Sequence, residues 1–123
     1  GNITATNLEA KDLKISVNSS GNFNGKILAT NLVANVYSSG NIIINGNAEN
    51  ATIKSTSSGN VKARELLIEN ANLLATSSGD ITVFVTKSLG ARATSSGLVT
   101  VYTNGMLDQS IVKKNSSGNV FIK

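Results

Sequence analysis

The chain has 123 residues, a net charge of +4 from 11 basic and 7 acidic side chains, and no cysteine or histidine. Disulfides, thiol nucleophiles and the Ser-His-Asp and Cys-His catalytic sets are therefore excluded, as are the usual zinc ligands. No segment has the roughly 20 apolar residues of a transmembrane helix, so we expect no membrane span.

A Ser-Ser-Gly tripeptide recurs along the whole chain. Its glycines lie 18 to 21 residues apart, and Gly1 fits the same phase. The six glycines are Gly21, Gly40, Gly59, Gly79, Gly97 and Gly118. Such spacing is typical of a solenoid in which each repeat forms one coil. We therefore expect an all-β parallel β-helix of about six coils over residues 1–123. It is expected to be one domain and to wind in the right-handed sense that parallel crossovers favour.

Each coil is predicted to begin with a strand directly after its glycine. The residue two positions after the glycine is apolar in every repeat, and the residue four positions after it is apolar or glycine. This period of two is typical of a strand with one buried face. The first of these columns contains Ile3, Phe23, Ile42, Val61, Ile81, Val99 and Val120. Asparagine directly follows most of the glycines, and stacked asparagines can form amide ladders.

A second strand is predicted before each later glycine. Residues eight, six and four positions before it are mostly apolar, as in Leu32, Ala34 and Val36 of the coil that closes at Gly40. The last coil departs from this pattern with Ser110 and Lys114, which a terminal repeat allows.

Residues 64–76 give a conflicting local signal. They combine good helix formers with apolar residues at helical spacing. However, Ala71, Leu73 and Ala75 fall in the apolar columns of the predicted second strand. We therefore expect a strand here rather than a helix.

Glycine has two physical reasons to occupy the corner between coils. It adopts positive φ without a Cβ clash, and it allows two backbones to approach closely. The corner serines are expected to hydrogen-bond within the turn or between coils, which is ordinary turn chemistry rather than catalysis.

The acidic residues do not recur at one position of every repeat, so we predict no paired-carboxylate site. They are Glu9, Asp12, Glu49, Glu65, Glu69, Asp80 and Asp108. Calcium-binding solenoid repeats place an aspartate in every turn, and this chain does not. We predict no catalytic residue, no metal site and no cofactor, and hence a protein that is not an enzyme.

Two outward columns are candidate binding surfaces. The residues Arg64, Phe84 and Tyr102 each lie five positions after a corner glycine. Stacked on successive coils, they would offer aromatic faces beside a cation to a sugar ring or an apolar partner. The alternative is that this column only stabilises the sheet.

The second column is basic. It contains Lys54, Arg92 and Lys113 and is interrupted by Leu74. A basic stripe can meet an anionic glycan or a nucleic acid, and the alternative is a solvated face. With the mild net charge, we expect no nucleic-acid partner.

The repeat resembles the family known as "putative autotransporter adhesin, head GIN domain". The resemblance rests on Ser-Ser-Gly-Asn/Asp followed by an aliphatic residue, and on residues 94–105 (TSSGLVTVYTNG) with residues 114–120 (KNSSGNV). The latter pair is similar to the family's closing pattern, except that Leu107 replaces its proline. The resemblance implies a secreted or surface-exposed bacterial β-helix without catalytic residues. It also implies that an N-terminal region is missing from this chain.

Three functions follow from these observations. The first is a non-enzymatic secreted or cell-surface module, in the cell envelope or outside the cell, that binds a surface glycan or protein. The second is a structural scaffold that assembles end to end through its coil ends, because bare strand edges can pair. The third is a polysaccharide-acting enzyme, which the missing carboxylate pair makes the weakest of the three.

Overall fold

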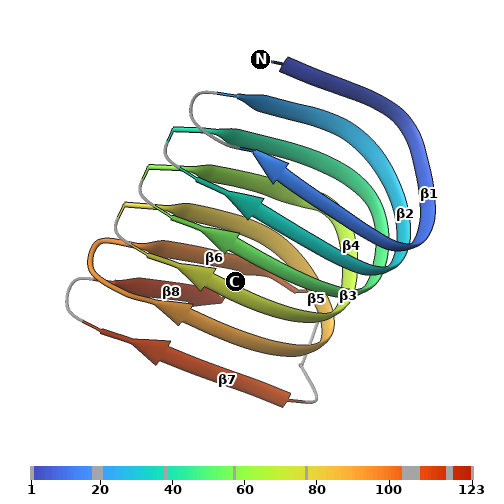
Figure 1. Cartoon of the computed structure of the whole chain (residues 1–123). Coiled ribbons are helices and arrows are strands. Elements are labelled where there is room, and N and C mark those ends of the chain that lie inside the picture. The colour runs from blue at the N-terminus through green and yellow to red at the C-terminus, as the bar shows by residue number, and fades with distance from the viewer. Residues whose placement is uncertain are drawn as a thin grey trace.

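The computed structural model describes residues 2–17, 21–37, 39–56, 58–76, 78–103, 109–115 and 118–122. All the strand pairings are parallel. The strands are β1 (Asn2–Val17), β2 (Asn22–Val36), β3 (Asn41–Ser55), β4 (Asn60–Ala75), β5 (Asp80–Ala93), β6 (Leu98–Tyr102), β7 (Gln109–Lys114) and β8 (Asn119–Ile122). The strands β1 to β5 each bend through one coil, and β6 with β7 forms the next coil (Figure 1). The predicted parallel β-solenoid is confirmed, and its number of coils roughly matches the prediction. The right-handed sense stays a prediction.

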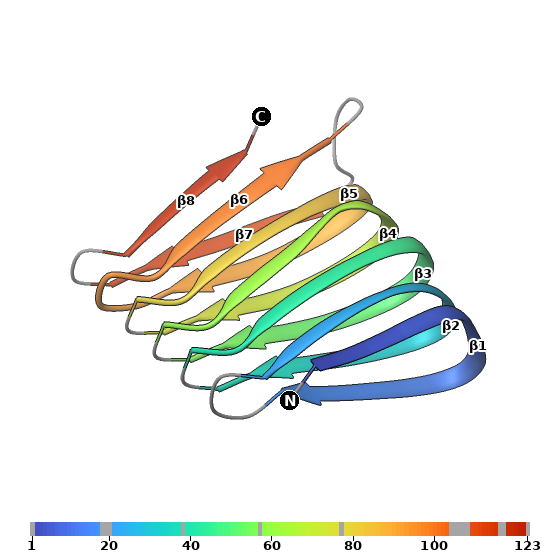
Figure 2. The same ribbon diagram turned by 90° about the horizontal axis from the view of Figure 1, so that it is seen from above.

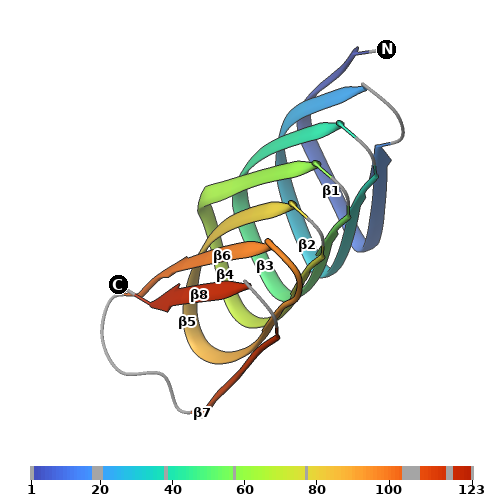
Figure 3. The same cartoon turned by 90° about the vertical axis from the view of Figure 1, so that its left-hand side faces the viewer.

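Each coil has two halves joined by a bend. The strand β6 pairs with residues 80–84 of β5, which form the first half of that coil. The strand β7 pairs with residues 88–93 of β5, which form the second half. Figure 2 shows β6 and β8 side by side in the first half, and Figure 3 shows the coils stacked in chain order. Residues at equivalent positions of successive repeats therefore face the same side of the stack.

The apolar columns predicted from the sequence form the core. The residues two positions after the corner glycines pair in one continuous series from Ile3 to Val120. From Phe23 onward their side chains are at most 6% exposed. In the second half, Leu32, Ala34 and Val36 are likewise buried and pair with their counterparts above and below. This continuous stack is what a single repeat could not supply, since one coil alone has no neighbour to cover it.

The segment predicted as a strand against its helical pattern is a strand. All of it except Thr76 lies within β4, which pairs along both halves with β3 and β5. Ala71, Leu73 and Ala75 point into the core and are at most 4% exposed. Helix propensities differ by only tenths of a kcal/mol per residue. A helix here would remove two sets of strand pairings and uncover the columns of both neighbours, so the stack outweighs local preference.

The corner is a β-turn whose fourth residue is the glycine. In the corner at Thr94–Gly97, the Gly97 amide donates to the Thr94 carbonyl oxygen at 3.0 Å. A Cβ on Gly97 would lie 2.6 Å from the Ala75 carbonyl oxygen of the preceding coil. Close backbone approach, one of the two reasons expected for glycine, is therefore confirmed.

The other reason, positive φ at the corner glycine, is wrong. In this corner the residue with positive φ is Ser95, at 56°. Among the described glycines, only Gly46 of β3 has positive φ, at 119°. A Cβ on Gly46 would overlap the Ile27 carbonyl oxygen, so glycine is required there on both counts.

The predicted asparagine ladder is present at the first residues of β2, β3 and β4. The Asn41 side-chain amide donates to Asn22 Oδ1 at 2.9 Å, and Asn60 donates in the same way to Asn41 at 3.1 Å. Each rung satisfies polar groups of two successive coils. The ladder thereby holds the coils in register along the edge of the stack.

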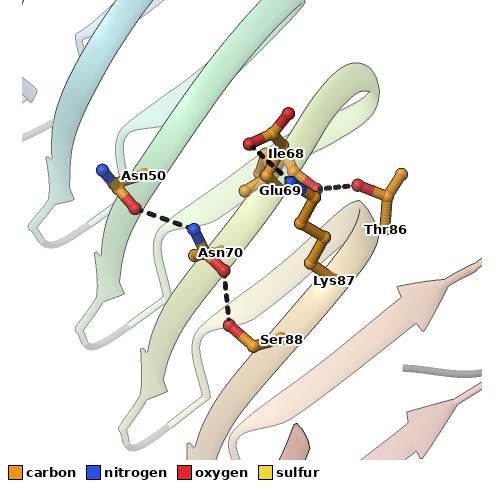
Figure 4. A network of polar contacts seen from close by, with 7 residues as sticks. All are labelled: Asn50, Ile68, Glu69, Asn70, Thr86, Lys87 and Ser88. Atoms are coloured by element: carbon orange, nitrogen blue, oxygen red, sulfur yellow. Dashed lines mark hydrogen bonds and ion pairs between the residues drawn. The ribbon is translucent and has the colours of Figure 1, made fainter. Parts of the chain in front are cut away.

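A second ladder, which the sequence analysis missed, runs along the start of the second half. Asn31 donates to Asp12 at 2.8 Å, Asn50 to Asn31 at 3.1 Å, and Asn70 to Asn50 at 3.0 Å. The Ser88 hydroxyl completes it by donating to Asn70 Oδ1 at 2.7 Å (Figure 4). This ladder could have been predicted from the sequence, because its residues all lie nine positions before a corner glycine.

Candidate functional site

The aromatic candidate site lies on the first half of the coils. Phe84 of β5 and Tyr102 of β6 are register partners, and both side chains are half-buried on the outward face. The exposed Arg64 of β4 extends past the intervening strand, and its guanidinium carbon lies 4.2 Å from the centre of the Tyr102 ring. This distance is typical of a cation–π contact. We call these three residues the aromatic site.

The three residues come together in a different way from the one predicted. The strands β4 and β5 lose register between Ala63 and Leu67, so Phe84 pairs with Leu67 and not with Arg64. The simple column expected from residue spacing is therefore correct for Phe84 and Tyr102 and wrong for the backbone of Arg64. The long arginine side chain, and not its backbone position, brings its charge to the ring.

The basic column lies on the second half of the coils and has the predicted register. Lys54 pairs with Leu74, Leu74 with Arg92, and Arg92 with Lys113. The three cationic side chains are exposed, and Leu74 between them is half-buried.

A shallow groove of about 350 Å³ runs beside these residues. Its lining comes from two adjacent outward columns of the second half, and we call it the basic groove. Besides the four residues of the basic column, it is lined by Thr52, Asn72, Gly90 and Ile111, and by Ile53, Leu73 and Ala91 from between the two columns. The structure thus keeps the aromatic site and the basic groove on different halves of the coil.

Other surface features are less specific. A groove of about 610 Å³ on the first half is lined by Asn22, Asn41 and Asn60 of the first ladder and by the column that includes Ile43 and Lys62. Within the described residues, no three His, Cys, Asp or Glu side chains gather as metal ligands. The same part of the chain has no helix that is long and apolar enough to span a membrane.

The last coil exposes apolar side chains. Ile111 is 62% exposed, Phe121 49%, Ile122 44% and Val112 37%. The last coil also departs from the apolar pattern of the second strand, as predicted, because Ser110 and Lys114 are exposed. End-to-end association through coil ends stays a prediction.

Comparison with known proteins is consistent with this architecture. Residues 1–105 match the family model described as "Putative auto-transporter adhesin, head GIN domain". The chain belongs to this family. Residues 94–105 of the resemblance lie inside the match, and residues 114–120 lie outside it. The family of this GIN domain is thus described as an adhesin and not as an enzyme.

One solved structure shares the fold of this GIN domain. It is a crystal structure described as a "Putative lipid binding protein" from Parabacteroides distasonis ATCC 8503, with 28% sequence identity and a TM-score of 0.80. The match covers 99% of this chain and 52% of that one, so this GIN domain spans about half the length of the Parabacteroides chain. No curated protein matches the sequence closely enough to count as a relative.

Proposed function

We propose that this GIN domain is a non-catalytic module of the bacterial cell surface that binds a glycan at the aromatic site. The observation that carries the proposal is the Arg64 guanidinium held 4.2 Å from the Tyr102 ring, next to Phe84. The family description as an adhesin supports a surface location and a binding role.

The chemistry of the aromatic site suits a sugar. The planar guanidinium has five N–H donors, which match hydroxyl and carboxylate oxygens. Phe84 supplies an apolar surface for the C–H face of a sugar ring. The contact with Tyr102 already restricts the Arg64 side chain, so less rotamer entropy is lost when a ligand binds.

Binding to an array of bacterial and host-surface glycans tests the proposal. For a glycan that the wild-type chain retains, Arg64→Ala should reduce affinity at least about tenfold, because a hydrogen bond from a charged group contributes about 1.5–3 kcal/mol. Arg64→Lys should recover little, since lysine keeps the charge and loses the planar fork. Titration calorimetry with the selected glycan measures both effects.

The matched control is Lys62→Ala, which removes an exposed cation two residues away on the same strand. It should leave affinity unchanged, and circular dichroism should show all three variants folded. Equal losses from Lys62→Ala and Arg64→Ala would show that only net charge matters. The proposal would also be contradicted if the wild-type chain bound no glycan on the array, or if Arg64→Ala left the affinity for a bound glycan unchanged.

The description of the Parabacteroides protein makes a lipid the alternative ligand. Cosedimentation with phosphatidylethanolamine and phosphatidylglycerol vesicles distinguishes glycan binding from lipid binding. Under the proposal, the chain stays in the supernatant. Pelleting with vesicles that Arg64→Ala abolishes would assign the aromatic site to lipid and not to glycan.

A further inference from the structure

We infer that the basic groove is a second binding site, separate from the aromatic site, for a linear anionic polysaccharide that lies along the stacking axis. The inference goes beyond the proposed function, because it concerns other residues on the other half of the coils. It rests on three observations: the distribution of charge, the spacing of the cations and the presence of Gly90.

Charge on this surface is of one sign. The two outward columns that line the basic groove contain Lys14, Lys54, Arg92 and Lys113 and no acidic residue. In the described part of the chain the one ion pair, Lys87 with Glu69 at 3.5 Å, lies elsewhere, at the bend (Figure 4). Within these two columns, no carboxylate offsets the positive charge of the cations.

The cations are arranged in a line. Adjacent parallel strands are about 4.8 Å apart, so Arg92 and Lys113 are one such step apart and Lys54 is two steps from Arg92. A chain with regularly repeated acidic groups can meet several of these cations at once. Thr52 and Asn72 add neutral hydrogen-bonding groups beside them, which suit sugar hydroxyls.

The backbone conformation at Gly90 does not require a glycine. Its φ is not positive, and a Cβ there would meet only the Asn72 side-chain oxygen at 3.0 Å and the Ala71 carbonyl oxygen at 3.9 Å. Glycine inside a strand is destabilising relative to residues with a side chain. Its effect here is to leave space between Asn72 and Ile111 in the basic groove.

The groove favours a glycan over a nucleic acid. None of its lining residues is aromatic, whereas single-stranded nucleic acids are held by base stacking on aromatic side chains as well as by charge. An acidic glycan needs only cations, hydroxyl partners and an apolar floor. Leu74 supplies that floor between Lys54 and Arg92.

Calorimetric titration of the whole chain with polygalacturonate, heparin, neutral dextran and oligothymidylate tests the inference. The two anionic polysaccharides should bind, with affinity that falls as salt rises, and dextran should not. The triple variant Lys54→Ala/Arg92→Ala/Lys113→Ala should lose at least tenfold in affinity. Its matched control, Lys11→Ala/Lys26→Ala/Lys62→Ala, removes the same charge from exposed positions outside the basic groove and should bind as the wild type does.

A second variant tests the groove without changing its charge. Gly90→Val fills the space with a β-branched residue suited to a strand, and it should also weaken polysaccharide binding at least tenfold while circular dichroism shows a folded chain. Arg64→Ala should leave this binding unchanged, which separates the inference from the proposed function. The inference is overturned by equal losses in the two triple variants, by wild-type affinity in Gly90→Val, or by oligothymidylate binding as tightly as the polysaccharides.

Discussion

Replacing Ile53 with alanine is expected to lower the free energy of unfolding by about 2–5 kcal/mol. The Ile53 side chain is fully buried, and it stacks between Ala34 of the coil before and Leu73 of the coil after. Both neighbours are fixed by strand pairing, so they cannot move in to fill the space that the missing atoms leave. The lost burial and the remaining cavity therefore add together.

Urea denaturation followed by circular dichroism measures this change. The matched control is Lys54→Ala, one residue further along the same strand and exposed on the opposite side of it. It should change the free energy of unfolding by no more than about 0.5 kcal/mol. Similar costs at the two positions would mean that the period of two does not separate a buried face from a solvent face.

Replacing Gly97 with alanine is expected to destabilise the fold by about 1–3 kcal/mol, as overpacking does in a filled interior. The new Cβ would lie 2.6 Å from the Ala75 carbonyl oxygen. That oxygen already accepts a 2.9 Å hydrogen bond from the Thr94 amide, so the backbone cannot withdraw without weakening the link between two coils.

Gly90→Ala provides the matched comparison, because it makes the same chemical change within a strand. Its Cβ would meet only the movable Asn72 side-chain oxygen closely, at 3.0 Å. Where the native backbone suits alanine, replacing glycine stabilises a protein by about 0.4–1 kcal/mol. Thermal and urea denaturation should therefore show opposite signs for the two substitutions. The same sign and size at both positions would refute the account of the corner.

The fold could be predicted because the length of one coil can be read from the spacing of the Ser-Ser-Gly repeats. One glycine per coil sets the phase, and the columns from Ile3 to Val120 then follow by counting. Counting failed where a strand changes its register. The shift between Ala63 and Leu67 leaves Arg64 out of line with Phe84. The unequal glycine spacings on the two sides of Gly79 require a bulge between these coils, but they do not say at which residue it falls.

Backbone detail was also beyond the sequence. Positive φ fell on Ser95 and Gly46, because the turn and the bend of the coil set these angles and the residue type only limits them. For the candidate sites, the sequence placed the cations of the basic column correctly. It could not predict the groove, which depends on how Asn72 and Gly90 pack side by side.

Cross-linking between coils tests the central claim most directly, namely that residues one repeat apart lie next to each other. The chain has no cysteine, so Thr82→Cys/Thr100→Cys introduces one pair at register partners on β5 and β6. Adjacent strands bring their Cα atoms within the roughly 4.4–6.8 Å that a disulfide needs. Lys62→Cys/Thr100→Cys, one coil further apart, exceeds that range.

Mild oxidation of the folded monomer, followed by mass spectrometry, measures the fraction of chains that form an intramolecular disulfide. The account predicts an intramolecular disulfide in nearly all of the Thr82→Cys/Thr100→Cys chains and in few of the Lys62→Cys/Thr100→Cys chains. Equal cross-linking in the two variants, or none in the first, would contradict it.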